Sequence, residues 1–157
     1  MATSKKVEPG ATVEQVLYRV VSRRPELEQL DNQIGVLIVR IEKALRDLKL
    51  GMRLSVSTGR GGDSHDEVLA FDKVNGSWRL ILESGLSDDP ETWSGRPLSD
   101  VDRRSRSDML RYGHLEELLL GAERALNEEL EDRRQALEAG TRFVDAVERL
   151  VGQEKTK

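Results

Sequence analysis

The sequence contains no cysteine, only 4 prolines, and aromatic side chains at 4% of its 157 positions. Without cysteine the chain has neither a disulfide framework nor a thiolate site, which suits a reducing cytoplasm. The few aromatic residues, together with 34% charged residues, argue against a thick globular core. Because proline is scarce and charges of both signs alternate, extensive disorder is not expected either. The composition therefore predicts an elongated, mainly helical protein.

Long apolar runs are also missing from the sequence. No stretch approaches the roughly 18 residues of a membrane span, and no signal-peptide core follows the N-terminus, so we expect a cytoplasmic protein without a membrane partner. The net charge of -4 argues against a broad surface for nucleic-acid phosphates. Residues 1–11 and 152–157 lack apolar periodicity and are predicted to be flexible tails. They flank one domain, residues 12–151.

An apolar ladder organises the first third of the chain. Its members are three and four residues apart in alternation, and Arg23 is the one polar step. This spacing forms a stripe of about 50 Å along one helix, which needs an equally long partner. We predict a helix over residues 12–50 that begins with a capping box between Thr12 and Gln15. The apolar members of this first seam are Val13, Val16, Val20, Leu27, Leu30, Ile34, Leu37, Ile41, Ala44 and Leu48.

Two features complicate this helix. Pro25 removes a backbone hydrogen bond, so the segment is either one kinked helix or two helices, the second beginning at Pro25. In addition, the apolar stripe is wider than a two-stranded coiled coil requires. One partner helix cannot cover it, so the sequence predicts self-association. The residues that widen the stripe are Leu17, Val21, Ile38 and Leu45.

Residues 52–84 show the two-residue alternation of strands. Asn75-Gly76 is a strong signal for a type I′ hairpin turn, so we predict a three-stranded antiparallel β-meander. A polar, irregular loop, residues 85–98, follows. Its Trp93 either pins the loop over the sheet or belongs to a partner surface. The strands are Met52–Thr58, Glu67–Val74 and Ser77–Ser84, and the apolar face comprises Leu54, Val56, Trp78, Leu80 and Leu82.

The last segment, residues 99–151, is predicted to be a second long helix capped by Ser99. The fold class is therefore α+β, mainly α, with two long antiparallel coiled-coil helices flanking the meander. That register would bring Arg23 to Glu129 as a pair that fixes alignment. The second seam comprises Tyr112, Leu115, Leu119, Ala122 and Leu126. Beyond Leu126 the strict count meets Glu129, Arg133, Ala136 and Gly140 before Phe143, Val147 and Leu150, whereas a shift of one residue gives Leu130, Leu137, Val144 and Val151.

Two groups of residues are candidates for ligand chemistry. The glycine-rich connection Gly59–Asp66 contains Arg60 and His65, and it is a flexible hairpin connection, an anion site or a metal site. Arginines gather around the start of the last helix, where they form either a solvated salt-bridged face or a site for an anion or nucleic acid. These arginines are Arg96, Arg103, Arg104, Arg106 and Arg111.

Signals for catalysis are poor. The two histidines, His65 and His114, are far apart in sequence, and the carboxylates lie on predicted helix faces. We therefore expect no enzymatic activity, no cofactor and no resident metal.

In layout, residues from Leu45 to Leu126, with the glycine-rich connection and the Asn75-Gly76 turn, resemble the YbaB-type nucleoid-associated proteins. The resemblance implies a dimer that binds DNA.

The sequence thus favours a non-catalytic, homo-oligomeric coiled-coil assembly or adaptor protein. Its partners are a second copy and another protein, to which the loops Gly59–Asp66 and Gly85–Leu98 are presented. The alternatives are a YbaB-like nucleic-acid-binding dimer and a binder of a small phosphorylated ligand through the arginine cluster. Candidate binding residues are Arg60, His65, Trp93, Arg96, Arg103, Arg104 and Arg106. Expected interface residues are Val20, Leu27, Leu30, Ile34, Leu37, Ile38, Ile41, Leu45, Leu115, Leu119 and Leu126.

Overall fold

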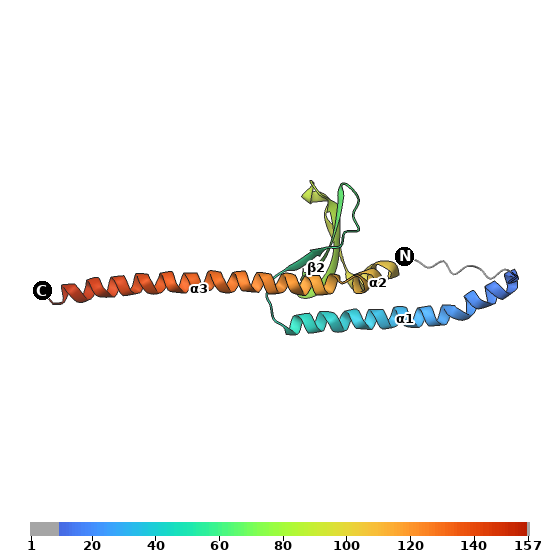
Figure 1. Ribbon diagram of the computed structural model, residues 1–157, viewed down its shortest axis with the longest axis horizontal. Helices are drawn as coiled ribbons and strands as arrows, with labels where there is room; N and C mark the ends of the chain where they lie inside the picture. The colour runs from blue at the N-terminus through green and yellow to red at the C-terminus, as the bar shows by residue number, and fades with distance from the viewer. Residues whose placement is uncertain (1–9, 157) are drawn as a thin grey trace.

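The computed structural model describes residues 10–156. It is mainly helical, with a four-stranded antiparallel sheet flanked by helices. Two long helices form a rod, and the sheet rises from one side of it (Figure 1). Of the flexible tails predicted from the sequence, residues 1–9 and 157 lie outside the described residues. At the other end, the last helix continues to Glu154, three residues beyond its predicted end at residue 151.

The first helix, α1, extends from Val13 to Asp47. Thr12 and Gln15 form the predicted capping box, in which each side chain accepts a hydrogen bond from the other residue's backbone N–H. Pro25 lies inside the helix, which continues through it and bends (Figure 1). The kinked helix is therefore the correct one of the two interpretations, because the outer face of a helix tolerates the missing hydrogen bond.

The sheet is a meander of four strands, not three. The β2–β3 hairpin closes at Asn75-Gly76, where both residues have positive φ, as a type I′ turn requires. The fourth strand lies inside the predicted loop 85–98, and its Ser-Gly-Arg-Pro sequence has no apolar alternation to reveal it. The segment forms a strand because it pairs with β3, and its own sequence pattern does not indicate one. The strands are β1 Leu54–Ser57, β2 His65–Val74, β3 Ser77–Leu86 and β4 Ser94–Pro97.

The predicted helix 99–151 is in fact two helices, α2 Arg103–Arg111 and α3 His114–Glu154. Gly113 separates them with φ +76°, a left-handed conformation that residues with a Cβ rarely adopt. Ser99 was wrongly predicted as the cap, because residues 98–100 form a 3₁₀ turn, η2. Asp102 caps α2 instead and accepts a hydrogen bond from the backbone N–H of Ser105.

The antiparallel arrangement was also wrong: α1 and the α2–α3 segment run in the same direction (Figure 1). Asp31 forms an ion pair with Arg103, and four residues later Gly35 lies beside the guanidinium of Arg106. The positions in contact thus advance in the same direction along both helices. The helices overlap along only part of their lengths, so each projects at one end. Glu129, the partner predicted for Arg23, instead forms an ion pair with Arg133 in its own helix.

One hydrophobic core joins α1, the sheet, α2 and the first turns of α3. The predicted apolar face of the sheet contributes to it: Leu54 and Leu80 are buried, and Trp78 stacks on Phe71 with ring centroids 5.4 Å apart. A buried carboxylate, Glu42, fastens α1 to the sheet. It accepts a 3.0 Å hydrogen bond from the N–H of Leu80. The core comprises Ile38, Leu45, Leu54, Leu69, Phe71, Leu80, Leu98, Met109, Leu118 and Ala122.

Candidate functional site

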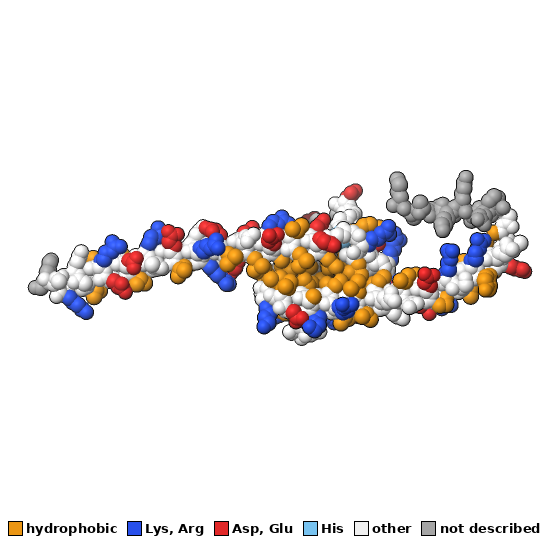
Figure 2. Space-filling model, turned by 60° about the horizontal axis from the view of Figure 1, so that its bottom comes forward, with side chains coloured by type: hydrophobic (Ala, Val, Ile, Leu, Met, Phe, Trp, Pro, Cys, Tyr) orange, Lys and Arg blue, Asp and Glu red, His pale blue; other side chains and the backbone are white. Residues whose placement is uncertain are grey.

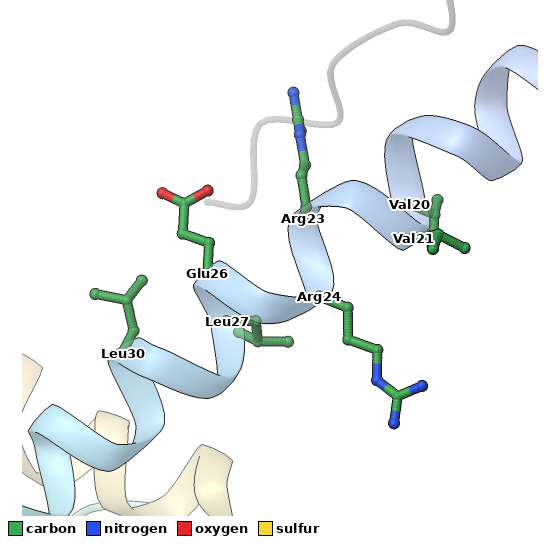
Figure 3. A pocket seen from close by; sticks show the side chains of 7 residues that line it. All are labelled: Val20, Val21, Arg23, Arg24, Glu26, Leu27 and Leu30. Atoms are coloured by element: carbon green, nitrogen blue, oxygen red, sulfur yellow. The ribbon is translucent and has the colours of Figure 1, made fainter.

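The N-terminal part of α1, residues 13–30, projects beyond the body of the molecule, and we call it the α1 arm. Its apolar side chains face solvent; Val20 and Leu27, for example, are 61% and 57% exposed. At the bend near Pro25 the arm borders a hollow of about 580 Å³. Arg23 and Arg24 point to opposite sides of the helix there (Figure 3). The hollow is lined by Val20, Val21, Arg23, Arg24, Glu26, Leu27 and Leu30.

The C-terminal part of α3, residues 127–154, projects at the opposite end and is called the α3 arm (Figure 1). A strict seven-residue repeat follows one side of it, and every member is about half exposed or more. This repeat is absent from the expected interface, because the strict count from Leu126 meets Glu129 and Arg133. The register shift after Leu126 is the signal that identifies it. The repeat comprises Leu130, Leu137, Val144 and Val151.

Between the arms, hydrophobic side chains gather along the line where α1 and α3 lie side by side (Figure 2). The expected interface residues divide by burial. Ile38 and Leu45 are buried in the chain's own core. Those at its edge, Ile34, Ile41, Leu115 and Leu126, are half buried. The exposed ones are Val20, Leu27, Leu30, Leu37 and Leu119. The helices therefore bury the face beside each seam and leave part of the seam itself open.

The glycine-rich connection is tethered to α2 through Arg60. The Arg60 guanidinium forms ion pairs with Glu67 at 3.1 Å and Asp108 at 3.3 Å, and it donates to the Ser105 hydroxyl at 2.9 Å. The loop passes so tightly over Gly61 that an added Cβ would collide with the carbonyl of His65. Two carboxylates already match the charge of Arg60, so it does not offer an unpaired cation to a phosphate.

A polar hollow of about 480 Å³ lies beside this tether. The Ser105 hydroxyl donates a 2.7 Å hydrogen bond to Asp102. That bond, with the Ser105 backbone N–H, lowers the pKa of the Asp102 carboxyl below its usual range. His114 is buried here, and its Nδ1 has no hydrogen-bond partner among residues 10–156. The hollow is lined by Thr58, Arg60, Asp102, Arg104, Ser105, Asp108, Tyr112 and His114.

The predicted arginine cluster is divided among several roles. Arg103 pairs with Asp31 at 3.2 Å, and Arg106 lies half buried beside Gly35. Arg111 stacks on the ring of Tyr112 at 5.3 Å. Arg104 is exposed at the polar hollow, whereas Arg96 is exposed on the edge strand β4. The five side chains therefore differ in their contacts, and within residues 10–156 Arg103 is the member that forms an ion pair.

Trp93 folds over the second face of the sheet, the one turned away from the core. Its indole N–H donates to the Leu86 carbonyl at 3.0 Å, and its ring lies so close to Gly85 that a Cβ there would collide with it. Arg53 crosses the same face to bond Asp72 and Glu83. The Arg53 guanidinium lowers the pKa of the Asp72 carboxyl. Trp93 thus holds the 85–98 segment against the sheet.

The end of the sheet at which β2 begins and β3 ends projects away from the helices (Figure 1). His65 begins β2 at this end, is exposed, and pairs in register with Leu86. It lies apart from the polar hollow that includes His114. Within residues 10–156, no cluster of three His, Asp or Glu side chains is placed to hold a metal ion. No helix in that range is long and apolar enough to cross a membrane.

Comparison with known proteins gives no assignment. No protein-family model, curated protein or solved structure matches the chain.

Proposed function

We propose that this protein is a non-catalytic, homo-oligomeric assembly or adaptor protein whose long helices form coiled coils between copies. The observation that carries the proposal is the pair of projecting arms with exposed apolar repeats. Exposed apolar surface is stabilised by about 25 cal/mol for each Å² removed from water. An isolated helix gains little stability without packing an apolar face, so both arms favour association.

The adaptor role rests on the sheet. It stands off the rod and carries two connections, Gly59–Asp66 and Gly85–Leu98, at a distance from the arms (Figure 1). Arg60 fastens the first connection to α2, and Trp93 fastens the second to β3. A fastened loop loses less conformational entropy when it binds, so a pre-ordered surface favours recognition of a protein partner. Self-association would display two or more copies of this surface, which raises avidity.

The nucleic-acid and phosphate-ligand alternatives both depend on free arginines. Ion pairs to Glu67, Asp108 and Asp31 use the charges of Arg60 and Arg103, so these contacts weigh against a continuous basic surface. Titration with duplex DNA and RNA at low salt tests the first alternative. A thermal-shift panel of nucleotides tests the second. We expect no salt-sensitive binding and no shift.

The mass of the protein in solution tests the assembly proposal. Light scattering and sedimentation across a micromolar concentration series should give at least twice the mass of one chain. The variants Leu27→Glu and Leu137→Glu place a charge in the two arm repeats and should raise the dissociation constant at least about tenfold. Gln29→Glu and Ala139→Glu add the same charge on the outer faces of the arms and should change it little. A single-chain mass at high micromolar concentration would refute the proposal.

A further inference from the structure

The two arms project from opposite ends of the body, although their helices run in the same direction (Figure 1). The α1 arm is about 27 Å long and the α3 arm about 42 Å, at a rise of ~1.5 Å per residue. Two copies that meet through the exposed side of α1 and α3 can be related by a twofold axis in two ways. An axis along the rod places like arms together. An axis across the rod places unlike arms together, antiparallel.

Charge disfavours pairing of like arms. In each seam, one polar step is an arginine: Arg23 in the α1 arm and Arg133 in the α3 arm. Pairing like arms in parallel would place each arginine opposite its own copy at a central position of a coiled coil. It would also oppose two copies of Glu128–Asp132, in which four of five side chains are acidic. Like charges directly opposed in this way destabilise the contact.

Charge favours pairing of unlike arms. Within one chain, Asp31 lies level with Arg103, so the two helices are aligned with each other. We place a cross axis at the middle of the overlapped part of α1, residues 31–48. At ~1.5 Å per residue, Arg23 of one copy then falls level with about residue 128 of the second. The basic segment Arg19–Arg24 would lie along the acidic segment Glu128–Asp132. Leu130 of the second copy would lie level with Val20 and Val21, beside the hollow near Pro25.

We propose that the protein is a twofold dimer in which the α1 arm of each copy packs antiparallel against the α3 arm of the other, with Arg23 facing Glu129 across the contact. This inference rests on the proposed self-association and specifies its geometry. Glu129 is free to make the contact because its present partner, Arg133, lies one turn away in an exposed pair of the kind that contributes little. Each dimer contains the arm contact twice, and each contact covers the α3 arm as far as about residue 138, because α1 begins at Val13.

Disulfide trapping tests the pairing, because the chain has no cysteine of its own. Val20→Cys and Leu130→Cys chains carrying different tags are made separately and also co-expressed, then oxidised. Unlike pairing gives a disulfide-linked dimer only from the co-expressed chains. The two copies of Val20 would lie about 60 Å apart in that dimer, at ~1.5 Å of rise per residue. Leu126→Cys and Leu137→Cys, each co-expressed with Val20→Cys in the same way, would detect antiparallel pairing in a shifted register.

The outcomes separate the two proposals. A covalent dimer from either variant alone means that like arms pair, which overturns the geometry but leaves self-association standing. A dimeric mass with no disulfide from any combination overturns the geometry as well. A single-chain mass overturns both.

Charge exchange gives a second test that does not require oxidation. Arg23→Glu and Glu129→Arg should each raise the dimer dissociation constant about tenfold, since each places like charges together twice per dimer. Both changes in one chain should restore it to within about threefold of the original. Arg142→Glu, on the outer face of the α3 arm, is the matched control. Losses that simply add in the double variant would overturn the Arg23–Glu129 contact.

Discussion

At the scale of single residues, the most consequential side chain is Glu42, which sequence reasoning missed. It lies next to the first seam, where a charged residue is ordinarily solvated, yet it is 3% exposed. The reason is found in β3: the backbone N–H of Leu80 lies just before the segment that pairs with β4, and the Glu42 carboxylate accepts its hydrogen bond. Arg79 adds an ion pair at 3.4 Å. A periodic pattern cannot show an unpaired N–H on a distant strand.

Replacement of Glu42 should therefore be costly. Glu42→Met keeps most of the volume but leaves the Leu80 N–H buried without an acceptor, which costs about 1–3 kcal/mol of unfolding free energy. Glu42→Gln keeps an acceptor oxygen and should cost less than half as much. Urea unfolding at one fixed protein concentration measures both. Equal losses would mean that the ion pair with Arg79, and not the hydrogen bond, holds α1 to the sheet.

At the scale of elements, regular sequence patterns were sufficient to predict secondary structure, whereas elements without such a pattern were missed. The capping box, the hairpin turn and the long apolar repeats each specify a local structure by themselves. The strand β4 and the break at Gly113 depend on tertiary contacts and on one backbone conformation instead. The sequence pattern around a glycine does not show whether the helix continues through it, as at Gly121, or ends there, as at Gly113.

This pair of glycines supplies a prediction with opposite signs. Gly113→Ala places a Cβ in the left-handed region and should lower the free energy of unfolding by about 1–2 kcal/mol. Gly121→Ala adds a methyl group inside α3 where no atom lies within 4 Å of the added Cβ, and should raise it by about 0.5–1 kcal/mol. Thermal and urea unfolding measure both. A stabilising Gly113→Ala would mean that α2 and α3 form one continuous helix, as the sequence pattern predicts.

At the scale of the whole molecule, the sequence predicted two long helices but not their relative direction. The seams of α1 and α3 were matched as partners within one chain in an antiparallel arrangement. The α1–α2 contacts at Asp31 and Gly35 instead fix a parallel arrangement. Similarly, the ion pairs of Arg60 and Arg103 could not be predicted from the sequence, because their partners Asp31, Glu67 and Asp108 come from three separate elements.

If the arms are covered only by a second copy, folding and association are linked, and thermal stability must depend on concentration. Mass action predicts that the melting temperature rises by about 2 °C for each tenfold increase in protein concentration. The double variant Leu27→Glu/Leu137→Glu should melt at a lower temperature that does not change with concentration, because its arms no longer pair. Gln29→Glu/Ala139→Glu should behave as the unmodified chain does. Scanning calorimetry over two decades of concentration makes the comparison. A melting temperature of the unmodified chain that does not change with concentration would mean that each copy is stable by itself, without pairing of the arms.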